Sequence, residues 1–188
     1  MEVNTKELIA GLVRLFSSEK PYGVPAICGE SGIGKTAICA QVAAKCGLEF
    51  RILPVSQLNP EDLGLLVSGD ASPFAKFQLS TLFDLAPDAK GLIILLDELN
   101  RPASDTVMNF VMGMVCERTL YGMAIDPRIS FIATLNPSGT GEYPDTRDIF
   151  SDLALLRRFN QITLMFDHVP FLEYVSNAGM DRKLVEFL

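Results

Sequence analysis

Hydrophobic residues along the chain fall into short unbroken runs separated by longer stretches with a helical period. Residues 5–18 repeat apolar side chains at helical spacing after an Asn4-Thr5 start signal, which predicts an amphipathic helix. Residues 35–46, rich in small side chains and closed by a glycine, predict a second helix, and residues 102–117 a third. The apolar runs are candidate strands, at residues 24–28, 49–55, 91–98, 128–134 and 159–164.

Strand and helix patterns alternate along the chain. This order predicts an α/β fold, a three-layer sandwich in which helices cover both faces of a five-stranded parallel sheet. Two connections exceed a plain crossover. About 35 residues separate Val55 from Gly91, too many for one helix and its loops, so we expect an insert there. The alternation around Gly122 predicts a small hairpin before the fourth strand.

The composition is that of an ordinary globular domain. The chain has 188 residues, enough for one sizeable core, and no apolar run reaches the roughly 18 residues that a membrane span requires. The net charge of −7 argues against general binding to nucleic acid, which requires clustered Lys and Arg. No export signal is present and the four cysteines lack metal-ligand spacing, so we expect reduced thiols in a cytoplasmic protein.

A glycine-rich loop, GESGIGKT, follows the first candidate strand and fits the pattern G-x-x-x-x-G-K-[ST]. Glycines at these positions let backbone N–H groups turn inward and cradle phosphates at the positive end of the next helix. The lysine reaches the β- and γ-phosphates, and the hydroxyl after it binds Mg²⁺. The sequence therefore predicts a site for nucleotide phosphates formed by Gly29, Glu30, Ser31, Gly32, Ile33, Gly34, Lys35 and Thr36.

Two carboxylates follow the third apolar run, in LIILLDELNR. Asp97 comes at the carboxyl end of this strand, where it is placed to hold Mg²⁺ through water. Glu98 follows at once and is suited to polarise the water that attacks the γ-phosphate. The pair favours transfer of phosphate to water rather than to an alcohol, and therefore hydrolysis over kinase chemistry.

Three more polar residues lie at strand ends. Asn136 ends the run ISFIATLN and is expected beside the acidic strand, where a neutral amide orients the water or senses the γ-phosphate. Arg157 and Arg158 lie between a helical pattern and the last strand. Two interpretations stay open for them: cations that suit a helix end, or arginines that reach a neighbouring subunit's nucleotide and stabilise the charge of phosphoryl transfer.

In this order, GESGIGKT, LIILLDELNR, CERTLYGMAIDPRISFIATLNP and LLRRF resemble the AAA+ ATPases of the MoxR and dynein-related branch, over residues 22–164. The DELNR and ATLNP phrases are more specific to this branch than the loop is. The resemblance implies a P-loop NTPase core that holds ATP and Mg²⁺ in a cleft between subunits of a nucleotide-dependent ring, usually a hexamer. It also implies chaperone-like remodelling of a client protein, sometimes with a von Willebrand A-domain partner.

The resemblance implies roles for single residues as well. Glu98 would be the catalytic base, Asn136 the first sensor and Arg158 the arginine finger that acts on the next subunit. Arg157 stands where relatives have an acidic residue, so which of the two arginines reaches across stays open.

The resemblance also divides the chain. Residues 1–165 would form the nucleotide-binding core and residues 166–188 the beginning of a helical lid, shorter than the family's own. The insert after Val55 would face the pore of the ring.

Two alternatives from other classes stay open. A nucleotide-dependent assembly or binding module would bind ATP with little turnover, and the short lid keeps this alternative open. A P-loop small-molecule kinase would need a mobile lid with several arginines, and residues 56–90 contain none.

Overall fold

A six-stranded parallel sheet forms the centre of the chain. The structure is a computed structural model that describes residues 1–18, 23–67, 76–138, 146–149 and 157–165. The strand order is β1-β10-β2-β9-β6-β3, and every neighbouring pair runs parallel. The strands are β1 (Glu2–Val3), β2 (Val24–Cys28), β3 (Glu49–Pro54), β6 (Leu92–Asp97), β9 (Ile129–Leu135) and β10 (Phe159–Leu164). The predicted α/β class and parallel sheet are confirmed.

The sheet has one strand more than the five that the sequence predicts. The additional strand, β1, is two residues long and pairs with β10 through Glu2↔Thr163 and Val3↔Leu164. Two residues carry no measurable hydrophobic period, so the pattern of the sequence could not identify this strand. Its pairing with a strand about 160 positions away creates it.

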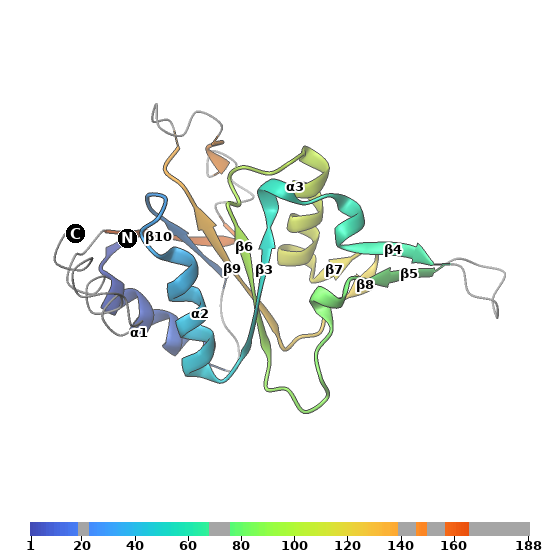
Figure 1. Cartoon of the computed structure of the whole chain (residues 1–188), viewed down its shortest axis with the longest axis horizontal. Helices are drawn as coiled ribbons and strands as arrows, with labels where there is room; N and C mark the ends of the chain where they lie inside the picture. Colours follow the sequence, from blue (N-terminus) through green and yellow to red (C-terminus); the bar gives the residue numbers. More distant parts are fainter. Residues whose placement is uncertain (19–22, 68–75, 139–145, 150–156, 166–188) are drawn as a thin grey trace, which may run out of the picture.

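Helices cover both faces of the sheet and complete the three predicted layers (Figure 1). α1 (Thr5–Phe16) and α2 (Lys35–Cys46) pack on one face. α3 (Asp105–Met112), continued by the π-helix η4 (Gly113–Glu117), packs on the other. All three predicted helices are therefore present in the described part of the chain.

The central strand β6 carries both cores. Its residues alternate between the two faces, so Ile93 and Leu95 pack with α1 and α2, whereas Leu92, Ile94 and Leu96 pack with α3. All five are 0 to 1% exposed. A strand buried on both faces reads as an unbroken apolar run, and this is the pattern that the sequence shows.

Helix boundaries differ from the sequence expectation by two or three residues. Asn4 caps α1 and forms a capping box with Glu7, so the predicted start is confirmed, but the helix ends at Phe16 rather than at residue 18. The third helix begins at Asp105, since Ser104 accepts a hydrogen bond from the backbone of the first turn. Caps rather than periodicity determine these ends.

In its described residues, the insert after β3 contains three short 3₁₀ turns and a hairpin. The turns are η1 (Val55–Gln57), η2 (Pro60–Asp62) and η3 (Thr81–Phe83), and the antiparallel hairpin consists of β4 (Gly64–Val67) and β5 (Lys76–Leu79). The hairpin projects away from the sheet (Figure 1). Its exposed apolar side chains are Leu65, Leu66, Val67 and Phe77.

The small hairpin predicted around Gly122 is confirmed. It pairs β7 (Thr119–Leu120) with β8 (Met123–Ala124). Its two turn residues, Tyr121 and Gly122, both have positive φ, 51° and 76°, as two-residue hairpin turns of this type require. Within the described residues, no helix has the length and apolar character needed to cross a membrane. The predicted lid, residues 166–188, lies outside the described residues.

Candidate functional site

The glycine-rich loop connects β2 to α2 at the carboxyl edge of the sheet. Gly32 and Gly34 have φ of 82° and 88°, a conformation that favours glycine, and a Cβ added to either would meet no atom within 4 Å. α2 begins without a side-chain cap and has no acidic residue in its first turn. The N-cap side chain therefore satisfies none of its first N–H groups, and such a helix start, with the positive end of its dipole, suits an anion such as phosphate.

Lys35, the first residue of α2, turns its side chain back over the loop. Its Nζ donates to the carbonyl oxygens of Gly29 at 2.7 Å and Glu30 at 2.8 Å, and to Asn136 Oδ1 at 3.0 Å. Burial lowers the pKa of Lys35 from its ordinary value, while Cys28, Asp97 and Glu98 act in the opposite direction. The loop and the end of β9 thus meet at this ammonium group, and the carboxylates after β6 act on it electrostatically.

The carboxylates after β6 have different surroundings. Asp97 accepts a hydrogen bond from the hydroxyl of Thr134, and the same oxygen of Thr134 accepts one from the Glu98 N–H at 3.2 Å. Glu98 lies beyond the strand, in a turn with φ of 53°, which is unusual for a residue with a side chain. Its carboxylate lies 3.5 Å from Asn136 Nδ2 and 3.7 Å from the Arg101 guanidinium.

Asn136 lies between the positive and the negative group. Its Oδ1 faces the Lys35 ammonium and its Nδ2 faces the Glu98 carboxylate. Asn136 is 5% exposed, so its amide lies inside the site rather than in solvent. The predicted placement of Asn136 beside the acidic strand is therefore what the structure shows.

Thr36 and Asp97, the residues predicted to bind Mg²⁺, belong to the two elements that flank this site, the start of α2 and the end of β6. A hydroxyl and a carboxylate are hard oxygen donors, and Mg²⁺ retains several waters and needs only one or two protein ligands. Their donor chemistry therefore fits the ion. The described residues contain no cluster of three or more acidic, His or Cys side chains that would hold a metal without a phosphate partner.

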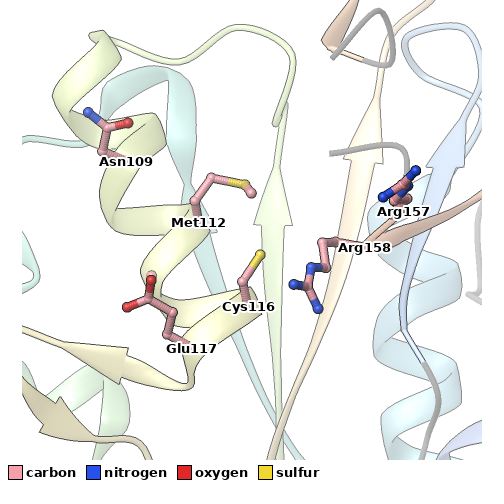
Figure 2. Close-up of a pocket in the computed structure, with 7 residues that line it drawn as sticks. Asn109, Met112, Cys116, Glu117, Arg157 and Arg158 are labelled. Atoms are coloured by element: carbon pink, nitrogen blue, oxygen red, sulfur yellow. The ribbon is translucent and has the colours of Figure 1, made fainter. Parts of the chain in front are cut away.

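Arg157 and Arg158 lie far from the loop of their own chain. They precede β10, and the Arg158 carbonyl accepts a hydrogen bond from Val24 N–H at the amino end of β2, whereas the loop begins at the other end of this strand. Five residues of strand span roughly 16 Å. Figure 2 shows the Arg158 side chain reaching toward Cys116 of η4, with Arg157 farther from that helix.

A cavity of about 660 Å³ lies between α3 and η4 on one side and the two arginines on the other (Figure 2). Both arginines are exposed. Burial raises the pKa of the Cys116 thiol, and Arg158 opposes this shift. The structure thus joins the loop, the acidic pair and Asn136 in one place, and leaves the arginines at the opposite edge of the sheet.

Sequence reasoning assigned no role to two residues that the structure places inside the site. Thr134 binds Asp97 and the backbone of Glu98, and Asn100 exchanges two hydrogen bonds with the backbone of Asn136. Both are polar residues next to buried apolar ones at the end of a strand. Such a position is a usable signal, because a polar group buried there needs a partner.

A comparison with protein families covers the part of the chain that forms this site. Residues 26–136, more than half of the chain, match the family described as "ATPase family associated with various cellular activities (AAA)". No curated protein matches the chain in sequence.

Among solved structures, a candidate ATPase from Cytophaga hutchinsonii is similar with a TM-score of 0.63 and 21% identity, over 93% of this chain and 50% of that one. NtrX from Brucella abortus is similar with a TM-score of 0.57 and 16% identity, over 94% of this chain and 42% of that one. The chain spans half of the first protein's length and less than half of the second's. At this identity the likeness shows a shared fold.

Proposed function

The chain belongs to the AAA family of ATPases, and on this premise we propose that it binds ATP with Mg²⁺ in the loop of residues 29–36 and hydrolyses it. The observation that carries the proposal is the arrangement around Asn136. Its amide lies between the ammonium of Lys35 and the carboxylate of Glu98, at 3.0 Å and 3.5 Å. A site that transfers phosphate to water needs a cation that binds the phosphates and, close to it, a carboxylate that polarises the water.

Each residue has a proposed part in the reaction. The loop backbone and the amino end of α2 hold the β- and γ-phosphates, and Lys35 exchanges its two loop carbonyls for phosphate oxygens. Thr36 and Asp97 would hold Mg²⁺, which neutralises phosphate charge when bound. Glu98 polarises the attacking water, and Asn136 orients that water against the γ-phosphate.

Members of this family generally assemble into rings, and we propose a ring, usually a hexamer, for this chain as well. The position of Arg157 and Arg158 supports it. They lie at the amino ends of the strands, whereas their own loop lies at the carboxyl ends. If they act on a nucleotide, it is therefore the nucleotide of a neighbouring subunit. Such a charge stabilises phosphoryl transfer in trans. Arg158 is the proposed finger, with Arg157 as the alternative.

The finer proposal is a MoxR-like remodeller that acts on a client protein in the cytoplasm, together with a von Willebrand A-domain protein as a partner. The order of the sequence motifs supports it. So does the hairpin of β4 and β5, since its exposed apolar side chains offer a surface for another polypeptide. In this proposal residues 1–165 are the core and residues 166–188 begin the lid.

Phosphate release from Mg-ATP as a function of protein concentration tests the proposal. Specific activity is expected to rise with concentration, because a neighbour completes each site. Glu98→Gln removes the carboxylate but keeps its size, so turnover should fall about a hundredfold or more while ATP binding persists. Unchanged turnover in Glu98→Gln contradicts the mechanism. ATP binding without turnover in the unmodified chain favours the alternative of a nucleotide-dependent binding module.

A further inference from the structure

The buried polar side chains of the described residues gather in one place. Asn100, Thr134 and Asn136 are 2%, 1% and 5% exposed, and they are the polar residues that the structure buries fully in the part of the chain it describes. All three lie at or just beyond the carboxyl ends of β6 and β9. Burying a polar group costs free energy unless it is hydrogen-bonded, so a cluster of three at one edge of an apolar sheet needs an explanation.

Asn100 forms a closed pair of hydrogen bonds with the backbone of Asn136. Its Nδ2 donates to the Asn136 carbonyl at 2.8 Å, and its Oδ1 accepts from the Asn136 N–H at 3.2 Å. Only one orientation of the amide satisfies both bonds, since one atom must donate and the other must accept. The side chain of Asn100 therefore fixes the peptide groups on both sides of the Asn136 Cα.

This pair of bonds is additional to those that join the two strand ends. The Leu99 N–H already donates to the Thr134 carbonyl at 3.0 Å, and the Glu98 N–H to the Thr134 hydroxyl at 3.2 Å. β9 itself ends at Leu135, so Asn136 lies one residue past the end of the strand. Without Asn100, the peptide groups of Asn136 would be buried without these partners at the point where its side chain must be directed.

We propose that Asn100 is a positioning residue for ATP hydrolysis, which holds the Asn136 amide between Lys35 and Glu98. The inference rests on the proposed function and deepens it. Among the residues that the structure describes, the Asn100 side chain bonds to backbone atoms of Asn136 and not to the phosphate loop, so we assign it no part in holding phosphate. It acts by fixing the direction of an amide that meets a cation at 3.0 Å and a carboxylate at 3.5 Å.

The kinetic test separates this role from one in stability. In Asn100→Ala, kcat should fall roughly tenfold to a hundredfold, as expected when a catalytic group is misdirected by about 1 Å, while the KM for ATP changes less than about threefold. The matched control is Asn4→Ala, which removes the cap of α1 and lowers Tm by about 3 °C without contact with the site. Its kcat should equal that of the unmodified chain.

A double variant shows whether Asn100 acts through Asn136. If it does, Asn100→Ala together with Asn136→Ala should be no slower than Asn136→Ala alone, because the group that Asn100 directs is already absent. Independent effects that multiply would overturn the proposal. So would an Asn100→Ala chain whose kcat falls no more than that of Asn4→Ala.

A measurement without turnover distinguishes failure of this inference from failure of the proposed function. The side-chain amide of Asn136 gives a pair of ¹H–¹⁵N signals that is identified by its loss in Asn136→Ala. In the unmodified chain this pair should lie away from the positions of exposed amides, and in Asn100→Ala it should move to them. If it stays in place, Asn100 does not position the amide, whether or not the chain hydrolyses ATP. If the chain lacks ATP turnover but the signals move, the proposed function fails and the positioning stands.

Discussion

Lys35 carries the clearest electrostatic signature of the site. It is a half-buried ammonium group that bonds to two loop carbonyls and one amide, and it has no carboxylate at hydrogen-bonding distance among its described contacts. Burial therefore dominates and lowers its pKa. A phosphate would supply the missing negative charge, so binding of ATP and protonation of Lys35 should support each other.

The first prediction follows from this pKa. As pH rises, the affinity for ATP should begin to fall at a lower pH than it would if Lys35 had the ordinary lysine pKa of 10.5. The reason is that the lowered pKa removes the ammonium charge at a lower pH. The stability of the ATP-free chain should change in the opposite direction. Between the lowered pKa and 10.5 the unfolded chain binds more protons than the folded chain, so stability rises with pH in this window. ATP titrations and urea denaturation at several pH values measure both trends.

Lys35→Ala is the control for that prediction. It should weaken ATP binding about tenfold or more through loss of a charge-assisted contact, and its remaining affinity should lose the alkaline decrease. A mutant that retained the same pH profile would show that another group titrates. Such a result would leave Lys35 without the role proposed for it.

At the scale of secondary-structure elements, β6 joins the two cores and ends in the acidic pair. It lies between β9 and β3 in the sheet, and its side chains contact helices on both faces. The strand therefore fixes where Asp97 emerges relative to α2 and to Asn136. The small hairpin of β7 and β8 joins the insert to α3, because its Tyr121 stacks on Phe77 of β5 at a centroid distance of 4.5 Å and meets the tilted ring of Phe110 of α3 at 4.9 Å.

The second prediction concerns this strand. Ile94→Ala removes a side chain with no exposed surface and leaves a cavity beneath α3, so the free energy of unfolding should fall by about 2–5 kcal/mol. Asn4→Ala, which removes only a helix cap, should cost about 1 kcal/mol. Urea denaturation with an unchanged m-value measures both. Equal losses for the two variants would mean that the contacts of β6 do not dominate stability.

In the molecule as a whole, the loop lies at the carboxyl ends of the sheet's strands and the two arginines lie at the amino ends. Because all strands are parallel, groups that follow strands collect at the carboxyl edge, and groups that precede strands collect at the other. Arg157 and Arg158 precede β10, whereas Lys35, Glu98 and Asn136 follow β2, β6 and β9. A head-to-tail assembly brings the two edges of successive subunits together, and such contacts close into rings when the rotation permits.

The third prediction tests that assembly. Arg158→Ala and Glu98→Gln chains should each have little turnover alone, but a mixture should recover part of the activity. An interface with an intact Glu98 from one chain and an intact Arg158 from the other is complete. Phosphate release across mixing ratios measures the recovery. If mixtures with Arg157→Ala recover activity and those with Arg158→Ala do not, the finger is Arg157. If neither mixture recovers activity, no arginine of this turn acts in trans.

The sequence by itself determined the loop, the three helices, five of the strands and the small hairpin. These features depend on neighbouring residues, through hydrophobic period and motif spacing, so they can be read without a structure. Only the tertiary structure decided three other features: the sixth strand, the hydrogen bonds of the Asn100 side chain to the Asn136 backbone, and the separation of the arginines from their own loop. Each of these depends on which strands become neighbours. Lys35 and Asn136 are 101 positions apart, and only the placement of β2 beside β9 brings them into contact.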